Sequence, residues 1–144
     1  MPTPLVVLPD PVLAVIQYLR ARSEVTALVV SANIVSALPE VDAPAWPFIL
    51  VNGMPSQGIW PSIDDAGVQI EALDIDHPTS SRKDTTSLIA RTVRAAMWAI
   101  ANDTVAAGVL SSCSEISGPQ WIPDTTTTPP LGRVIQHQSV LLHA

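Results

Sequence analysis

The sequence predicts an α+β fold, with two helices packed on one face of a mainly antiparallel four- to five-stranded sheet. Two segments, near 11–21 and 83–102, carry apolar residues at helical spacing. Other segments alternate with the two-residue period of strands. Because two helices cannot cover both faces of such a sheet, we expect its second face or its edges to find another partner.

The first helix begins with a strong signal at Asp10-Pro11. Asp10 can cap free backbone N–H groups, and proline at the first helical position misses no hydrogen bond. Arg20 and Arg22 lie near the end of this helix, where the helix dipole favours cations. The second helix is predicted from its apolar stripe, which consists of Leu88, Ile89, Thr92, Val93, Ala96, Met97, Ile100 and Ala101.

Five short segments are β-rich or alternate in polarity, and we predict strands there. They are residues 33–38, 47–52, 68–75, 109–116 and 133–143. Residues 25–30 fit a short strand or a helical turn equally well. Residues 53–67 contain two prolines and three glycines, and we predict there a long loop or a loose hairpin tip that is mobile in the isolated subunit.

The composition indicates a single domain, residues 1–144, that associates with other proteins. A chain of 144 residues can bury a core without metal or disulfides, and its one cysteine, Cys113, cannot form an internal disulfide. Only 14% of the residues are charged, whereas 47% are hydrophobic. No apolar run reaches the roughly 18–20 residues that span a bilayer, so self-association is favoured over membrane association. The net charge of −6 argues against a protein that grips nucleic acid through its phosphates, although DNA could pass nearby.

The sequence offers no convincing catalytic or metal site. Asp74, Asp76 and His77 lie close together, but a metal site needs several convergent ligands, and a solvated strand end is the favoured interpretation. His137 and His143 share one face of the last predicted strand. Without a nucleophile and oxyanion donors around them, they are interpreted as surface or edge residues. We therefore expect no enzymatic activity, no metal and no cofactor.

Large aromatic residues near prolines and glycines are the main interface candidates. Trp60, with Ile59 beside it, lies in the predicted loop, where a neighbouring chain suits it better than solvent does. Trp46 and Trp121 stand beside prolines at strand margins. Filling the ends of the core is the favoured interpretation for these two, and an interface is the alternative. Asp64-Asp65, in the same loop, is interpreted as a solvated tip that could also face a partner.

Four segments carry a resemblance to a known protein family. They are the Asp10-Pro11 helix ending in Tyr18-Leu19-Arg20-Ala21-Arg22, the run Val35 to Pro39 followed by Trp46 to Val51, the helix segment Ile89 to Ala96, and Gly118 to Asp124 before a terminal strand. In this order, and across nearly the whole chain, they resemble the tail terminator (tail-completion, minor tail protein) family of long-tailed bacteriophages. Two features depart from the family pattern, namely the Thr/Pro run after Asp124 and the polar residues Gln136, His137 and Gln138 in the last strand.

The resemblance implies a mechanical role in a virion. Six copies would form a ring that caps the head-proximal end of the tail tube, ends tube polymerisation and joins the tail to the neck. The implied partners are further copies of the chain, the tail tube protein and head–tail connector or neck proteins, with the tape measure protein as another candidate. DNA would pass through the lumen without specific binding. The implied location is the neck region of the virion tail, after assembly in the host cytoplasm.

Two alternatives stay open at this point. The first is another head–tail connector component, an adaptor or a stopper. The second is a small-molecule-binding or enzymatic α+β domain, which would need convergent polar groups in a pocket.

Overall fold

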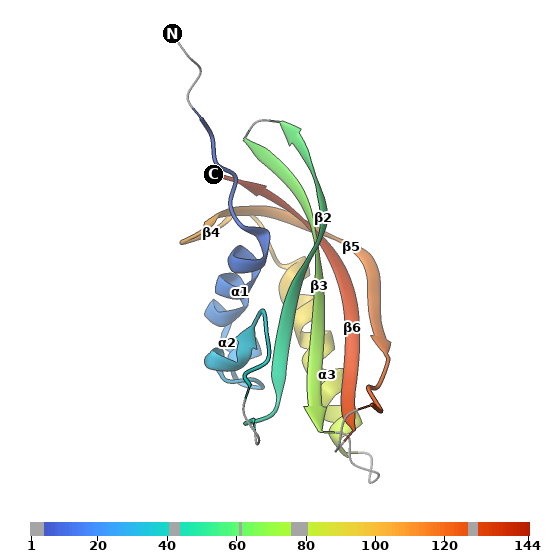
Figure 1. Cartoon of the computed structure of the whole chain (residues 1–144). Helices are drawn as coiled ribbons and strands as arrows, with labels where there is room; N and C mark the ends of the chain where they lie inside the picture. The colour runs from blue at the N-terminus through green and yellow to red at the C-terminus, as the bar shows by residue number, and fades with distance from the viewer. Residues whose placement is uncertain (1–4, 41–43, 61, 76–80, 127–129) are drawn as a thin grey trace.

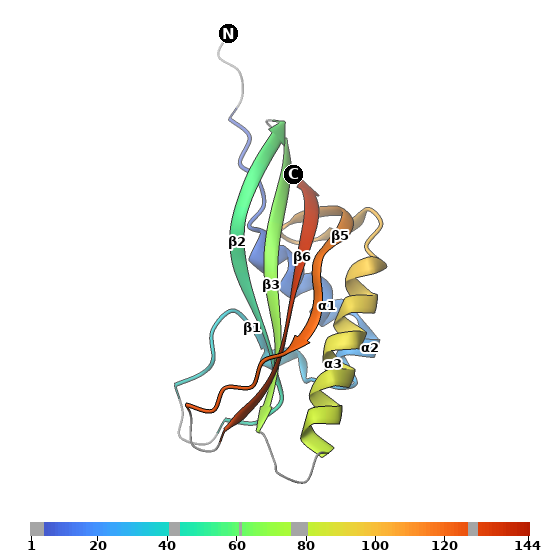
Figure 2. The ribbon, with the colours of Figure 1, turned by 90° about the vertical axis from the view of Figure 1, so that its right-hand side faces the viewer.

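A computed structural model of the chain shows a curled six-stranded sheet with its helices on one face (Figures 1 and 2). The structure describes residues 5–40, 44–60, 62–75, 81–126 and 130–144, and for residues 57, 59, 60 and 81–84 it describes the backbone only. The elements in chain order are α1 (Pro11–Ala21), α2 (Ser23–Thr26), the 3₁₀ helix η1 (Ser31–Asn33), β1 (Ile34–Val35), β2 (Phe48–Trp60), β3 (Ile63–Ile75), α3 (Ser81–Trp98), β4 (Asp103–Val105), β5 (Gly108–Trp121) and β6 (Leu131–His143).

The strand order is β1-β2-β3-β6-β5-β4. β1 pairs with β2 in parallel, and the other neighbouring strands pair antiparallel. The expected antiparallel sheet of four or five strands with two helices is therefore wrong, since the sheet is mixed, has six strands and carries three α-helices. β1 falls within the strand predicted at 33–38, and the additional elements α2 and β4 span only four and three residues. Segments this short show too few residues to reveal a period.

α1 begins and ends where its capping signal predicts. Asp10 Oδ1 accepts hydrogen bonds from the N–H groups of Val12 and Leu13, at 3.0 and 3.4 Å. α3 ends at Trp98, four residues before the predicted end. Asn102 has a left-handed backbone, with φ of 54°, which no α-helix continues, and the chain turns there into β4.

Residues 53–67 were predicted as a long loop or a loose hairpin tip, and the structure shows the second alternative, with both strands paired. They form the far ends of β2 and β3, which pair as a long hairpin up to Trp60 and Ile63. The pairing shifts register between Gly53 and Ser56 and again between Gly58 and Trp60. Such irregularities, on a strand at the sheet edge, accommodate Pro55 and the glycines without ending the strand. The mobility of this hairpin in an isolated subunit stays a prediction.

The core lies between the helices and one face of the sheet. Every second residue of β6 is buried there, from Gly132 to Leu142. Ile49, Val51 and Ile70 pack from the neighbouring strands against side chains of α1 and α3. The buried Tyr18 hydroxyl donates to the Ala96 carbonyl, and this bond joins α1 to α3.

Candidate interaction surfaces

The second face of the sheet, opposite the helices, has no helix over it in the part of the chain that the structure describes (Figure 2). We call it the open face. The β6 residues on this face are partly exposed, whereas their neighbours on the helix side are buried. At one end, Trp46 partly closes the open face, since its ring meets Phe48 edge-on with centroids 5.2 Å apart. The open face is thus the largest sheet surface left for another molecule.

A chain of hydrogen bonds crosses three strands on the open face. Ser117 Oγ lies 2.7 Å from His137 Nδ1, and His137 Nε2 lies 3.0 Å from Gln69 Oε1. Gln69 Nε2 in turn donates to Glu71 Oε1 at 2.8 Å. The register explains the chain, because His137 of β6 stands opposite both Gln69 of β3 and Ser117 of β5. Because Gln69 presents its carbonyl oxygen, the neutral imidazole carries its N–H on Nε2 and donates it to Gln69. Its Nδ1 then accepts a hydrogen bond from the Ser117 hydroxyl.

Of the two interpretations of His137, edge residue is excluded because β6 is a central strand, and its half-buried side chain lies at the surface of the open face. A serine paired with a histidine is also the arrangement that nucleophilic catalysis uses. Catalysis additionally needs a substrate cavity and oxyanion donors beside the serine. The Ser117, His137 and Gln69 side chains thus form a hydrogen-bonded polar band across the open face.

Acidic groups are more frequent than basic ones on the open face. Asp65 accepts a hydrogen bond from the Ser139 hydroxyl, and Glu71 lies further along the same strand. Arg133 also lies on this face, and its Nε donates to the Ile122 carbonyl at 2.9 Å. By contrast, six of the chain's seven basic residues lie in or beside the helices, namely Arg20, Arg22, Arg82, Lys83, Arg91 and Arg94. The basic residues of the chain are thus concentrated away from the open face.

Both edges of the sheet carry long strands with little cover. Among the described residues, β1 pairs with β2 only at Ile49 and Leu50. At the other edge, β4 pairs with β5 only from Gly108 to Leu110. Next to β4, the Ser111 carbonyl also accepts a hydrogen bond from the Asn102 N–H at 3.0 Å. The outer sides of Val51–Trp60 and Ser112–Trp121 are therefore unpaired in the described chain. Unpaired strand edges are ready templates for pairing with another chain.

Buried polar residues connect α3 to the opposite, helix-covered face. Gln136 Nε2 donates to the Ala90 carbonyl at 2.9 Å, and Gln138 Nε2 donates to Gln136 Oε1 at 3.0 Å. Gln138 Nε2 also lies 3.3 Å from Glu115 Oε1. Both glutamines are almost fully buried. Gln136 and Gln138, two of the unusually polar residues of the last strand, thus help to hold α3 on the sheet.

Arg94 and Glu115 extend this layer to the surface. Arg94 Nε and Nη2 reach the two carboxylate oxygens of Glu115 at 2.6 and 2.7 Å. These bonds lower the pKa of Glu115 and raise the pKa of Arg94. The guanidinium also lies 4.3 Å above the Trp98 ring, which is half exposed. Burial, and then the charge of Glu115, raise the pKa of the Cys113 thiol to about 11, so Cys113 is protonated and unreactive at neutral pH.

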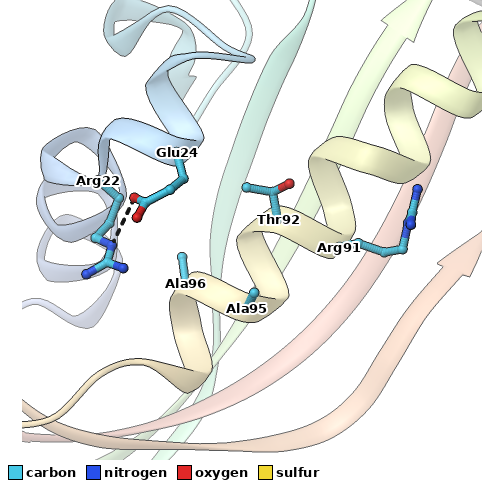
Figure 3. Close-up of a pocket in the computed structure, with 6 residues that line it drawn as sticks. All are labelled: Arg22, Glu24, Arg91, Thr92, Ala95 and Ala96. Atoms are coloured by element: carbon cyan, nitrogen blue, oxygen red, sulfur yellow. Dashed lines mark ion pairs between the residues drawn. The ribbon is translucent and has the colours of Figure 1, made fainter.

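A groove of about 310 Å³ lies between the α1–α2 region and α3 (Figure 3). Its lining residues are Arg22, Glu24, Arg91, Thr92, Ala95 and Ala96. Arg22 Nε stands 3.5 Å from Glu24 Oε2, and the Thr92 hydroxyl donates to the Leu88 carbonyl at 2.8 Å. The Thr92 hydroxyl is thus engaged within its own helix.

The six predicted interface residues divide between two ends of the sheet. Asp64-Asp65 and the Ile59-Trp60 backbone lie at the hairpin end, whereas Trp46 and Trp121 belong to the opposite end. The two aspartates are not the solvated pair that was predicted. Asp64 is buried on the helix side of β3, while Asp65 is exposed on the open face. The side chains of Ile59 and Trp60 fall outside the described part.

The two tryptophans at the other end pack on their own chain. Trp121 is half-buried against the core, and a side-chain carbon added to Gly132 would lie 3.0 Å from its ring. Trp46 is half-buried beside Phe48. An interface role for any of the six stays a prediction. Asp74, predicted as a solvated strand end, is buried, which corrects that interpretation, and Asp76 and His77 lie outside the described residues.

The hydrogen-bonded chain through His137 was not found from the sequence. His137, Gln69 and Ser117 are far apart in the chain and meet only through strand register. The one available signal was the run Gln136-His137-Gln138, which is unusually polar for a strand. In the described residues, no three His, Cys, Asp or Glu side chains converge as metal ligands would. No helix in that part of the chain is long and apolar enough to cross a membrane.

Comparison with known proteins identifies a shared fold. No protein-family model matches the sequence, and no curated protein matches it significantly. Among solved structures, a chain described as "Virion of native gene transfer agent (GTA) particle" superposes with a TM-score of 0.61. The alignment covers 90% of this chain and 92% of that chain, with 16% sequence identity. This likeness extends over nearly the whole of both chains.

Proposed function

We propose that the protein is a structural component of a phage-like virion. In this proposal it forms a hexameric ring that caps the head-proximal end of the tail tube and joins the tail to the neck. The observation that carries the proposal is the fold shared with a chain of a gene transfer agent virion over nine-tenths of both chains. The tail terminator resemblance in the sequence supplies the finer role. No catalytic activity belongs to this role.

The two uncovered sheet edges support ring formation. β2 and β5 run in opposite directions at opposite edges of one sheet, and each leaves about ten residues unpaired on its outer side in the described chain. The β5 edge of one copy can therefore pair with the β2 edge of the next in antiparallel fashion. Such a head-to-tail contact is heterologous. It closes a ring when the rotation that relates one copy to the next is a whole-number fraction of 360°.

The open face is suited to line the channel of such a ring. If it points inward, exposed Asp65 and the Ser117–His137–Gln69 chain face the passing DNA. Carboxylates repel phosphates, and the band's donors are already bonded within the protein. DNA would therefore slide along this surface without being held.

Particles produced without this protein provide the direct test. A terminator that is missing should leave overlong, headless tubes beside DNA-filled, tailless heads in negative-stain images. Tails of normal length beside unjoined heads would instead identify an adaptor or a stopper, which is the second candidate function. Within intact particles, the ring should show six-fold symmetry in averaged images. A symmetry other than six or three would contradict the terminator role.

A further inference from the structure

The segment Leu5 to Leu8 is apolar and lies outside the helices and strands, with Leu5 to Val7 exposed and Leu8 half-buried. Leu5 is 90% exposed and Val7 is 76% exposed, which are the largest values among the exposed large hydrophobic residues of the described chain. None of the backbone hydrogen bonds described for the chain involves this segment. An uncharged aliphatic run in water gains nothing from this position, and exposed apolar surface of this kind marks a contact site.

The segment is held firmly at one point. Pro9, which follows it, is buried against the start of β5. A side-chain carbon on Gly108 would overlap the Pro9 ring and approach the His143 carbonyl oxygen to 3.0 Å. Asp10, the next residue, caps α1. The segment therefore leaves the body in a fixed direction, at the end of the sheet where β6 also ends (Figure 1).

This exit point lies on a row of paired residues that runs across the sheet. The row consists of Trp60, Ile63, His143, Val109 and Thr104, in that order from one edge to the other. The segment leaves from the β5–β4 side of this row, three strand spacings from its own β2, or roughly 14 Å. If neighbouring copies in a ring pair β5 with β2, the Trp60 end of the neighbour's β2 lies next to the β5–β4 side of this copy. Residues 5–8 leave the domain on that same side.

We propose that residues 5–8 form a strap that packs on the end of β2, at Gly58–Trp60, of the adjacent copy in the ring. Four extended residues span roughly 13 Å, enough to cross the short β4 edge onto the neighbour. The strap adds an aliphatic contact where β4 prevents direct pairing of β5 with that end of β2. This inference rests on the proposed ring, and it assigns the strap to a second copy rather than to the tube or neck.

A disulfide cross-link between copies tests the contact. The variant combines Val7→Cys with Gly58→Cys in a Cys113→Ser background, because an added carbon at Gly58 meets no atom within 4 Å. Particles assembled with this variant and mildly oxidised should give a covalent ladder of this chain up to six copies. Each single-cysteine variant is the control and should give no ladder beyond dimers. Six-fold rings in these particles without a ladder would overturn the strap.

The aliphatic character of the strap is tested separately. Leu5→Ser with Val7→Ser should lower the amount of this protein retained in purified particles roughly ten-fold or more, since two aliphatic contacts are lost. Leu5→Ile with Val7→Ile is the matched control and should retain the wild-type amount. Equal retention of both variants would overturn the strap while leaving the ring intact. If wild-type particles contain no ring of this chain, the proposed function fails and the strap fails with it.

Discussion

β6 carries polar side chains on both faces, and the two sets have different surroundings. On the helix side, Gln136 and Gln138 are buried, and their amides bond to one another and to α3. On the open face, His137 bonds to Gln69 and Ser117 but is only half-buried. The same strand thus uses polarity for two purposes. Under the helix it fixes packing, and on the open face it provides a surface that another molecule can approach.

Burial decides how much each set contributes to stability. A buried amide that loses its partner cannot turn to water, so its desolvation is uncompensated. When a half-exposed imidazole loses a hydrogen-bond partner, water can take the partner's place with little loss of stability. The comparison therefore predicts a large stability difference between two adjacent positions, 137 and 138.

The largest effect is expected for Gln138→Ala. It removes bonds to Gln136 and Glu115 and leaves a cavity under α3. We expect a loss of about 2–4 kcal/mol in the free energy of unfolding, measured by urea denaturation. Gln138→Met is the matched control, because it keeps most of the volume and removes only the hydrogen bonds. If Gln138→Ala costs less than His137→Ala, the distinction between the two faces is wrong.

A smaller effect is expected for His137→Ala on the open face. It removes the bonds to Ser117 and Gln69, both of which water can reach. We expect a loss of about 1 kcal/mol in the free energy of unfolding, also from urea denaturation. Ser117→Ala should cost still less, since it breaks only the last link of the chain. A loss at position 137 as large as that of Gln138→Ala would place His137 in the structural core.

Features that depend on residues close together in the sequence could be predicted from it. Features that depend on strand register could not. The start of α1 depends only on the neighbouring residues Asp10 and Pro11, so it could be predicted from the sequence. For residues 53–67 the sequence left open a loop or a hairpin tip, because irregular pairing admits Pro55 and glycines that usually end strands. The open-face chain was missed because only tertiary pairing brings Gln69, His137 and Ser117 together.

The ion pair at the rim of the covered face gives a pH-dependent prediction. Arg94 lowers the pKa of Glu115, so the pair stabilises the fold above the ordinary glutamate value of about 4.3 and loses this effect as pH falls. Arg94→Met should therefore destabilise the protein at pH 7, and its difference from wild type should shrink at pH 3. Arg91→Met, on the same helix but without a carboxylate partner among the described residues, is the control. A difference independent of pH would contradict the prediction.

The smallest effect compares two thiols placed on opposite faces of one strand. Cys113 lies on the helix side of β5, and burial raises the pKa of its thiol to about 11, whereas Ser114, next to it, is exposed on the open face. At pH 8 a thiol of pKa near 11 is roughly 0.1% thiolate, while an unperturbed one is roughly one-quarter thiolate. Native Cys113 should therefore react with iodoacetamide at least about 100-fold more slowly than a Ser114→Cys thiol in a Cys113→Ser background. In concentrated urea both thiols lose their surroundings and should react at similar rates. The free energy of unfolding of the Ser114→Cys, Cys113→Ser variant should differ little from that of the native protein. Equal native rates would mean that the helix-covered layer does not extend to the edge strand, and that the contrast between the two faces is confined to the centre of the sheet.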